Sequence, residues 1–178
     1  MASLGEQEWI RAARAGSAPA FARLVGAHQS AVRAFLRRTL SGGWAEADDV
    51  AQETFVSAWQ ALPRLRDDQG FRAWLLGIAW RRAQDRIRQA RRGAARDQAW
   101  LEVTPSVDGA SFADRLAVRQ ALADLAPDVR ASVALCLADG WSHAEAAQAL
   151  GLPLGTVKSH VARGRARLLV ALGGCDDA

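Results

Sequence analysis

One stretch near the C-terminal end decides the fold of this chain: residues 142–168 read SHAEAAQALGLPLGTVKSHVARGRARL. In the opening Ser-x-x-Glu pattern, each side chain satisfies an exposed backbone donor at the start of a helix. Further on, Ala147 is small enough to let a second helix approach, and Gly151 supplies a turn. Val157 then fills the space between the two helices. The stretch therefore predicts a helix-turn-helix.

The second of these helices has an apolar face and a polar, basic face. Apolar or small residues recur at three- and four-residue steps from Val157 to Leu168. Short polar groups and forked arginines on the other face can contact base edges in a DNA major groove, and flanking basic side chains can contact phosphates. An ordinary helical hairpin with a solvated basic face is the competing interpretation. The residues expected to contact DNA are Thr156, Lys158, Ser159, His160, Arg163 and Arg167.

Helical periodicity continues outward from this motif in both halves of the chain. The spacing predicts helices over residues 7–15, 17–41, 45–61 and 71–92, and His28 lies on the apolar stripe of the second of these, which predicts a packed core histidine. In the second half, one helix is expected to end at Ala126 and the next to run from Pro127 to Gly140. The side chains expected to face inward on that last helix are Val129, Val133, Cys136 and Leu137.

No β-strand pattern interrupts these helices, so the sequence predicts an all-α fold. Residues 93–111 contain Gly, Pro, Ser and Asp with little periodicity, which is typical of a flexible linker. The expected organisation is two small helical domains, residues 1–92 and 112–172, with a tail at 173–178.

Charge and composition narrow the function. The first 96 residues hold 16 arginines and nine acids, which favours a polyanionic partner for one part of the molecule, although a solvated arginine-rich surface is the simpler reading. Two cysteines, Cys136 and Cys175, make no disulfide framework or metal site. We find no nucleophile–base pair or phosphate-binding loop, no signal peptide and no apolar run that could enter a membrane. These absences predict a cytoplasmic protein that is not an enzyme and uses neither metal nor cofactor.

Three motifs together resemble the extracytoplasmic-function (ECF) sigma factors of the sigma-70 superfamily. Residues 151–168 resemble the helix-turn-helix that binds the promoter −35 element, although many response regulators carry a related string. ADDVAQETFVSAW at 47–59 resembles the polymerase-binding helix. FRAWLLGIA at 71–79, with Asp85 and the arginines that follow, resembles the −10-binding helix. These motifs stand in the family's order and are separated by a linker of suitable length.

The resemblance implies roles for named residues. The polymerase-binding face, which would dock on the clamp coiled coil of the largest subunit, is Asp48, Asp49, Gln52, Glu53 and Val56. The residues implied to face −10 DNA are Trp80, Arg81, Gln84, Asp85, Arg88, Arg91 and Arg92. The bulk of Trp80 fits stacking on a base and packing in the core equally well. His160 and Arg81 depart from the family, which usually has Arg and often has Asn at these positions.

The implied function is transcription initiation: the chain binds core RNA polymerase and directs it to promoters with −10 and −35 elements. The family resemblance also implies an anti-sigma factor as a partner, of a kind that is often membrane-bound. A stand-alone helix-turn-helix regulator would need a dimerisation or ligand-binding domain, which the sequence lacks. A decoy that only sequesters an anti-sigma factor would have no use for the basic residues Lys158, Arg163 and Arg167.

Overall fold

The computed structural model describes residues 4–65, 70–94, 118 and 120–171, and the whole of this part is built from helices and the turns between them. The predicted all-α fold is confirmed. Of the segment expected to be a linker, Gly93 and Ala94 end a helix, and the remainder lies outside the described residues. The beginning of the second predicted domain, at residue 112, also lies outside them.

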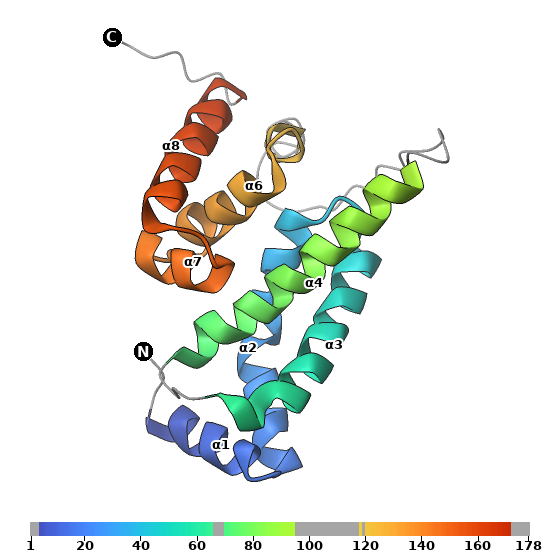
Figure 1. Cartoon of the computed structure of the whole chain (residues 1–178), viewed down its shortest axis with the longest axis vertical. Coiled ribbons are helices and arrows are strands. Elements are labelled where there is room, and N and C mark those ends of the chain that lie inside the picture. Colours follow the sequence, from blue (N-terminus) through green and yellow to red (C-terminus); the bar gives the residue numbers. More distant parts are fainter. Residues whose placement is uncertain (1–3, 66–69, 95–117, 119, 172–178) are drawn as a thin grey trace, which may run out of the picture.

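Three long helices form the body of the N-terminal half (Figure 1). They are α2 (Ala18–Thr39), α3 (Gly43–Ala61) and α4 (Phe71–Ala94), and α1 (Leu4–Arg14) packs on α2. A short 3-10 helix, η1 (Leu62–Arg64), follows α3. The start of α2 follows from local sequence: Ser17 caps it, with its Oγ 3.4 Å from the Ala20 amide, and a proline occupies the first turn.

Aromatic side chains fill the space between these helices. His28 is buried beside the ring of Phe71, at 5.2 Å between centroids, and its Nε2 lies 2.7 Å from Oε1 of Glu6. The prediction that His28 is a packed core residue is confirmed. Trp80, on α4, is only 1% exposed and meets the ring of Phe35 edge-on at 6.3 Å.

The C-terminal half contains α6 (Pro127–Val133), a π-helical turn η3 (Ala134–Ala138), α7 (His143–Leu150) and α8 (Leu154–Ala171). Before them, residues 120–123 are helical and Leu125 is buried in the turn that follows. The preceding helix therefore ends slightly before the expected Ala126.

One detail of the predicted core differs at the end of α6. The Asp139 amide bonds to the Ala134 carbonyl, five residues back, at 3.1 Å, so this turn holds one residue more than an α-helical turn. The buried side of this segment is formed by Ala131, Ala134 and Leu135, which are spaced i, i+3, i+4. Leu137, two residues after Leu135, lies on the other side and is 47% exposed, so the expectation that it faces inward is wrong.

The helix-turn-helix forms as its sequence predicts. Ser142 and Glu145 make a complete capping box at the start of α7, and these hydrogen bonds lower the pKa of the Glu145 carboxyl. Gly151 takes the left-handed conformation with φ +66°, which favours glycine at the end of a helix. Val157 is fully buried between the helices of this half.

Gly164 lies where α8 packs tightly against α6. A Cβ added there would lie 2.2 Å from Cγ2 of Val133 and 3.4 Å from Cγ1 of Val129. Because Val133 is stiff and buried, the two helices would have to move apart to admit even a methyl group.

We therefore expect Gly164→Ala to lower the free energy of unfolding by about 1–2 kcal/mol, because overpacking outweighs the better helix propensity of alanine. Urea denaturation followed by circular dichroism measures the change. Gly26→Ala is the matched control, since Gly26 is a mid-helix glycine on α2 with open space at its Cβ. Gly26→Ala should stabilise the protein, and equal effects of the two variants would contradict the packing argument.

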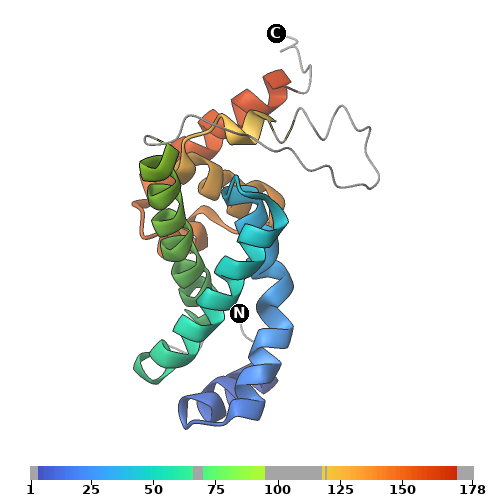
Figure 2. The ribbon, with the colours of Figure 1, turned by 90° about the vertical axis from the view of Figure 1, so that its right-hand side faces the viewer.

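The two halves pack against each other rather than standing apart. Helix α7 lies along α4, and α6 meets α2, so buried residues of both halves form one hydrophobic core (Figures 1 and 2). At the α4–α7 contact, a Cβ on Gly77 would lie 3.0 Å from the Ala149 carbonyl oxygen. The guanidinium of Arg72 stacks 4.3 Å from the centre of the buried Trp141 ring. The sequence pattern predicts two domains, but it does not predict that they pack against each other.

Two arginines, one from each half of the chain, make polar contacts with the other half. Arg38 at the end of α2 pairs with Asp139, with 2.6 Å between Nη1 and Oδ1. Arg130 on α6 is 8% exposed and donates to the Thr39 carbonyl and the Ser41 hydroxyl, each at 3.3 Å. Arg130 also donates to the carbonyls of Ala123 and Leu125, at 2.9 and 3.2 Å. The buried guanidinium thus ties the C-terminal end of α2 to the turn before α6.

Candidate functional site

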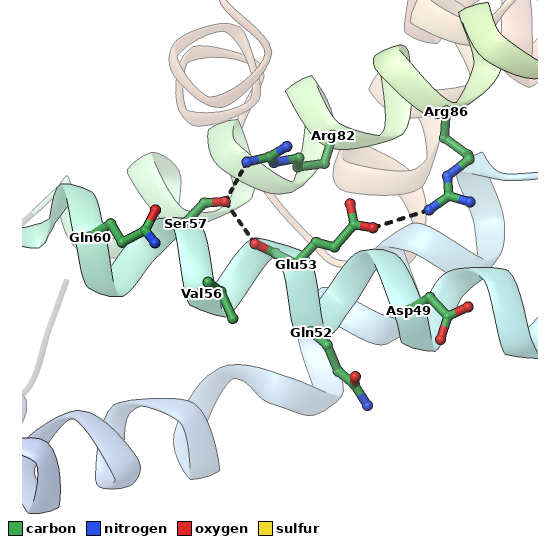
Figure 3. A pocket seen from close by; sticks show the side chains of 8 residues that line it. All are labelled: Asp49, Gln52, Glu53, Val56, Ser57, Gln60, Arg82 and Arg86. Carbon is green, nitrogen blue, oxygen red and sulfur yellow. Dashed lines mark hydrogen bonds and ion pairs between the residues drawn. The ribbon is translucent and has the colours of Figure 1, made fainter.

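A shallow groove runs between α3 and α4 on the surface of the N-terminal half (Figure 3). Its α3 side presents four of the residues expected to bind polymerase, and we call Asp49, Gln52, Glu53 and Val56 the docking face. All four are exposed, and Val56 is an apolar side chain that is 58% exposed. The lining residues are Asp49, Gln52, Glu53, Val56, Ser57, Gln60, Arg82 and Arg86.

Arginines from α4 reach across this groove to α3. Nη2 of Arg86 lies 3.2 Å from Oε1 of Glu53, and Nη2 of Arg82 donates to the Ser57 hydroxyl at 2.7 Å. Ser57 in turn donates to the Glu53 carbonyl at 2.7 Å. The groove therefore contains two acids and two arginines, so its formal charges cancel when all four side chains stay in place.

Asp48, the fifth residue expected to bind polymerase, lies apart from the docking face. Its Oδ1 is 3.4 Å from Nε of Arg33 and 3.4 Å from Nη2 of Arg37, so it faces α2. Arg37 also stacks 3.6 Å from the ring centre of Trp44, an aromatic residue that is 49% exposed. Asp48 therefore anchors the start of α3 to α2.

Most of the residues expected to face −10 DNA form one exposed basic face of α4. Gln84 is half-buried in this face, and Arg88 pairs with Asp85 on the same helix. Trp80 does not belong to this face, because it is buried in the core against Phe35. Its assignment to DNA is corrected here, and packing is its role in this structure. The exposed residues are Arg81, Asp85, Arg88, Arg91 and Arg92.

The outer face of α8 carries most of the residues expected to contact −35 DNA. Thr156 is half-buried at the start of the helix, and Lys158, Ser159, Arg163 and Arg167 are exposed. The Arg167 side chain donates to the Asp124 carbonyl at 3.1 Å, while Arg163 makes only a long contact, 3.4 Å, to the Ser159 carbonyl. An array of exposed hydrogen-bond donors on one helix face suits a DNA groove.

His160 is the exception on α8, and its assignment to DNA is corrected. It is 9% exposed, and its Nδ1 lies 3.3 Å from the Ser132 hydroxyl on α6. The sequence spacing could have predicted this burial. Position 160 is three residues after Val157 and four before Gly164, so it lies on the same helix face as these two buried residues. A histidine there packs inward as those neighbours do.

Arg82 and Arg86 are site residues that sequence reasoning missed. The two arginines are four residues apart, a spacing that places them on the same helix face, and this face of α4 is turned toward α3. In the sequence they belong to a run of arginines that differ only in position. Which of these arginines face a neighbouring helix depends on how α4 packs, and the sequence of α4 alone does not contain that information.

Nothing in the described part of the chain suggests a metal centre or a membrane anchor. Its His, Cys, Asp and Glu side chains form no group of three or more that could hold a metal ion. None of its helices combines the length and the apolar character needed to cross a bilayer.

Partial burial raises the pKa of the Cys136 thiol, so the reactive thiolate is disfavoured.

Comparison with known proteins gives two family matches, one in each half. Residues 24–93 match the model of sigma-70 region 2, and residues 115–168 match sigma-70 region 4. A probable RNA polymerase sigma-C factor of Mycobacterium bovis is 36% identical over 154 residues, which cover 78% of this chain and 82% of the relative. The ECF sigma factor SigM of Mycobacterium tuberculosis is 36% identical over 170 residues, covering 94% of this chain and 85% of SigM.

Two solved structures share the fold. The sigma factor RpoE of Bartonella quintana, solved with the anti-sigma factor NepR, matches with a TM-score of 0.75 and 27% identity. That match covers 89% of this chain and 98% of RpoE. CnrH, solved with the cytosolic domain of CnrY, matches with a TM-score of 0.70 and 30% identity, covering 98% of this chain and 99% of CnrH.

Proposed function

Because this chain belongs to the ECF group of the sigma-70 family of RNA polymerase sigma factors, we propose that its docking face on α3 binds core polymerase while α4 and α8 bind promoter DNA. The chain is an alternative sigma factor that directs RNA polymerase in transcription initiation, and it is not an enzyme. The single observation that carries the assignment of sites is the groove in which exposed acids of α3 adjoin the basic helix α4.

The docking face has the chemistry that a basic helical partner requires. Asp49 and Glu53 attract cationic side chains, and the exposed Val56 offers an apolar contact next to Glu53. Complementary charge across an interface speeds association and favours one orientation of the partners. The clamp coiled coil of the polymerase largest subunit is the partner we propose, and Asp48 supports the face indirectly by fixing the start of α3 to α2.

We assign the two DNA elements to different helices. The exposed arginines of α4 would hold the backbone of the −10 element, and Gln84 and Asp85 on the same helix would read its bases. The exposed residues of α8 would enter the major groove of the −35 element, with Arg163 as the base-reading arginine because its side chain has no close partner among the described residues. Tethering both helices to polymerase raises the effective concentration of the second contact.

An anti-sigma factor is the regulatory partner we propose. The matched structures support this partner, because RpoE is bound there to the anti-sigma factor NepR and CnrH to the cytosolic domain of CnrY. We also propose that the protein works in the cytoplasm, where core polymerase and promoter DNA are found. Both proposals rest on the family and not on a feature of this chain alone.

The docking assignment is tested by binding and run-off transcription with purified bacterial core RNA polymerase. Asp49→Arg combined with Glu53→Arg should weaken binding to core by at least about tenfold and abolish discrete transcripts, because like charges then face the basic partner. Glu8→Arg, a charge reversal at an exposed acid on α1, is the control that should change neither result.

Two outcomes would contradict the proposal. If wild-type protein binds duplex DNA but ignores core polymerase, the chain acts as a stand-alone regulator. If both charge-reversed proteins bind core as well as the wild type does, the docking face lies elsewhere.

A further inference from the structure

The docking face is already engaged within the free protein. Glu53, one of its two acids, is held by Arg86 from the DNA-binding helix at 3.2 Å. Figure 3 shows Arg86 descending from α4 toward α3, with Glu53 directed up to meet it. A basic partner that docks on α3 must therefore compete with an arginine that belongs to the protein itself.

We propose that Arg86 is shared between two alternative partners: Glu53 in the free protein, and a phosphate of the −10 DNA once polymerase has docked. This inference rests on the proposed function. When a cationic side chain of polymerase takes over Glu53, Arg86 is released to bind DNA. Arg86 thereby couples polymerase docking on α3 to promoter binding on α4.

The position of Arg86 on α4 allows this exchange. Successive residues of an α-helix are about 100° apart around its axis, so Arg86, on the side of α4 that faces α3, borders the exposed face that carries Asp85. Its side chain is long, and it is 33% exposed while Glu53 is 49% exposed. An ion pair so open to solvent contributes little stability, so either competitor can displace it.

The charge of the groove gives the exchange its direction. With Arg82 and Arg86 in place the groove is formally neutral, and a basic helix gains little by approaching it. Movement of Arg86 toward a phosphate exposes the full charge of Glu53 to the partner. Arg82 differs from Arg86, because its acceptor is the neutral Ser57 hydroxyl and not a carboxylate of the docking face.

Thermodynamic linkage makes the coupling reciprocal. If docking frees Arg86 for DNA, then bound DNA must strengthen docking by the same factor. Free protein would therefore bind promoter DNA about two- to fivefold more weakly than it does when docked on polymerase, because one of its phosphate contacts is occupied.

Arg86→Gln separates this coupling from a merely structural role. The variant should bind core polymerase about two- to fivefold more tightly, because Glu53 is no longer paired. Its holoenzyme should bind promoter DNA about two- to fivefold more weakly, and the slope of log affinity against log salt should fall by about one phosphate contact. The DNA is the promoter fragment on which wild-type holoenzyme starts a discrete transcript.

Two further variants sharpen the test. Arg88→Gln removes the same charge from the same helix, but the ion pair of Arg88 is with Asp85 on α4 itself. Arg88→Gln should therefore weaken promoter binding and leave the affinity for core unchanged. Arg86→Lys retains the charge and should return both affinities toward the wild-type values, which would exclude a simple loss of folding.

The inference is overturned if Arg86→Gln weakens both interactions, leaves both unchanged, or matches Arg88→Gln in its affinity for core. Those outcomes leave the proposed function intact, provided that wild-type protein binds core and starts discrete transcripts. Failure of the wild type in these assays would instead refute the proposed function.

Discussion

Replacement of Trp80 by alanine is expected to lower the free energy of unfolding by about 3–5 kcal/mol, the range typical of a large aromatic side chain lost from a core. Trp80 is the largest fully buried side chain among the described residues, and its ring packs edge-on against Phe35. The surrounding helices cannot collapse fully into the space, so a cavity remains. Urea or thermal denaturation followed by circular dichroism measures the loss.

Trp80→Phe separates packing from DNA contact. The indole Nε1 is buried without a hydrogen-bond partner among the described residues, so phenylalanine removes an unsatisfied polar group along with part of the ring. We expect this variant to lose less than about 1.5 kcal/mol and to keep promoter binding. A folded Trp80→Phe protein that had lost promoter binding would show that the ring reaches DNA after all.

Replacement of Arg130 by alanine is expected to cost about 3 kcal/mol and to loosen the contact between the two halves. Its guanidinium serves four acceptors, two from the C-terminal end of α2 and two from the turn before α6. Removing a buried cation leaves such acceptors without donors, which is among the larger effects a single substitution produces. Burial, together with repulsion from Arg91, lowers the pKa of Arg130, and Asp124 opposes that shift.

Denaturation and small-angle X-ray scattering measure the two consequences of Arg130→Ala, lost stability and a larger radius of gyration. Arg163→Ala is the control, because Arg163 is an exposed arginine whose hydrogen bond to the Ser159 carbonyl is long, at 3.4 Å. It should change stability by less than about 0.5 kcal/mol. If Arg130→Ala were as stable and as compact as the control, the buried guanidinium would not join the halves.

Local signals explain why the helices could be predicted from sequence. Ser17 caps α2, the Ser142–Glu145 capping box starts α7, and Gly151 ends it. Each of these residues acts within one turn of chain, so its effect does not depend on distant neighbours. The exposed surfaces of α3 and α8 could be predicted from the helical periodicity of the sequence, which separates polar from apolar positions.

Residues whose environment depends on packing were harder to place. Trp80 was assigned to DNA by resemblance and His160 from the polar face of its helix, whereas both are buried. Leu137 was expected to face inward, whereas the buried side of its helix is formed by Ala131, Ala134 and Leu135. Arg82 and Arg86 are distinguishable from their neighbouring arginines only once α3 lies beside α4.

The contact between the halves was the least predictable feature. Arg38, Asp139 and Arg130 are charged, and charged residues are mostly exposed, so sequence alone gives no reason to bury or pair them across about a hundred residues. Gly77 likewise reads as an ordinary small residue within an apolar helix. Its tight approach to Ala149 exists only in the assembled structure.

That tight approach restricts how the chain can be recombined. A chimera that kept the first 94 residues and took its helix-turn-helix from a relative, in order to recognise a different −35 element, would also replace Ala149, Arg130 and Asp139. The donated half would have to bring a backbone that lies as close to Gly77, and charges that meet Thr39 and Arg38. The proposed recognition of the −35 element is therefore not a freely exchangeable module, because the half that contains α8 is fitted to the other.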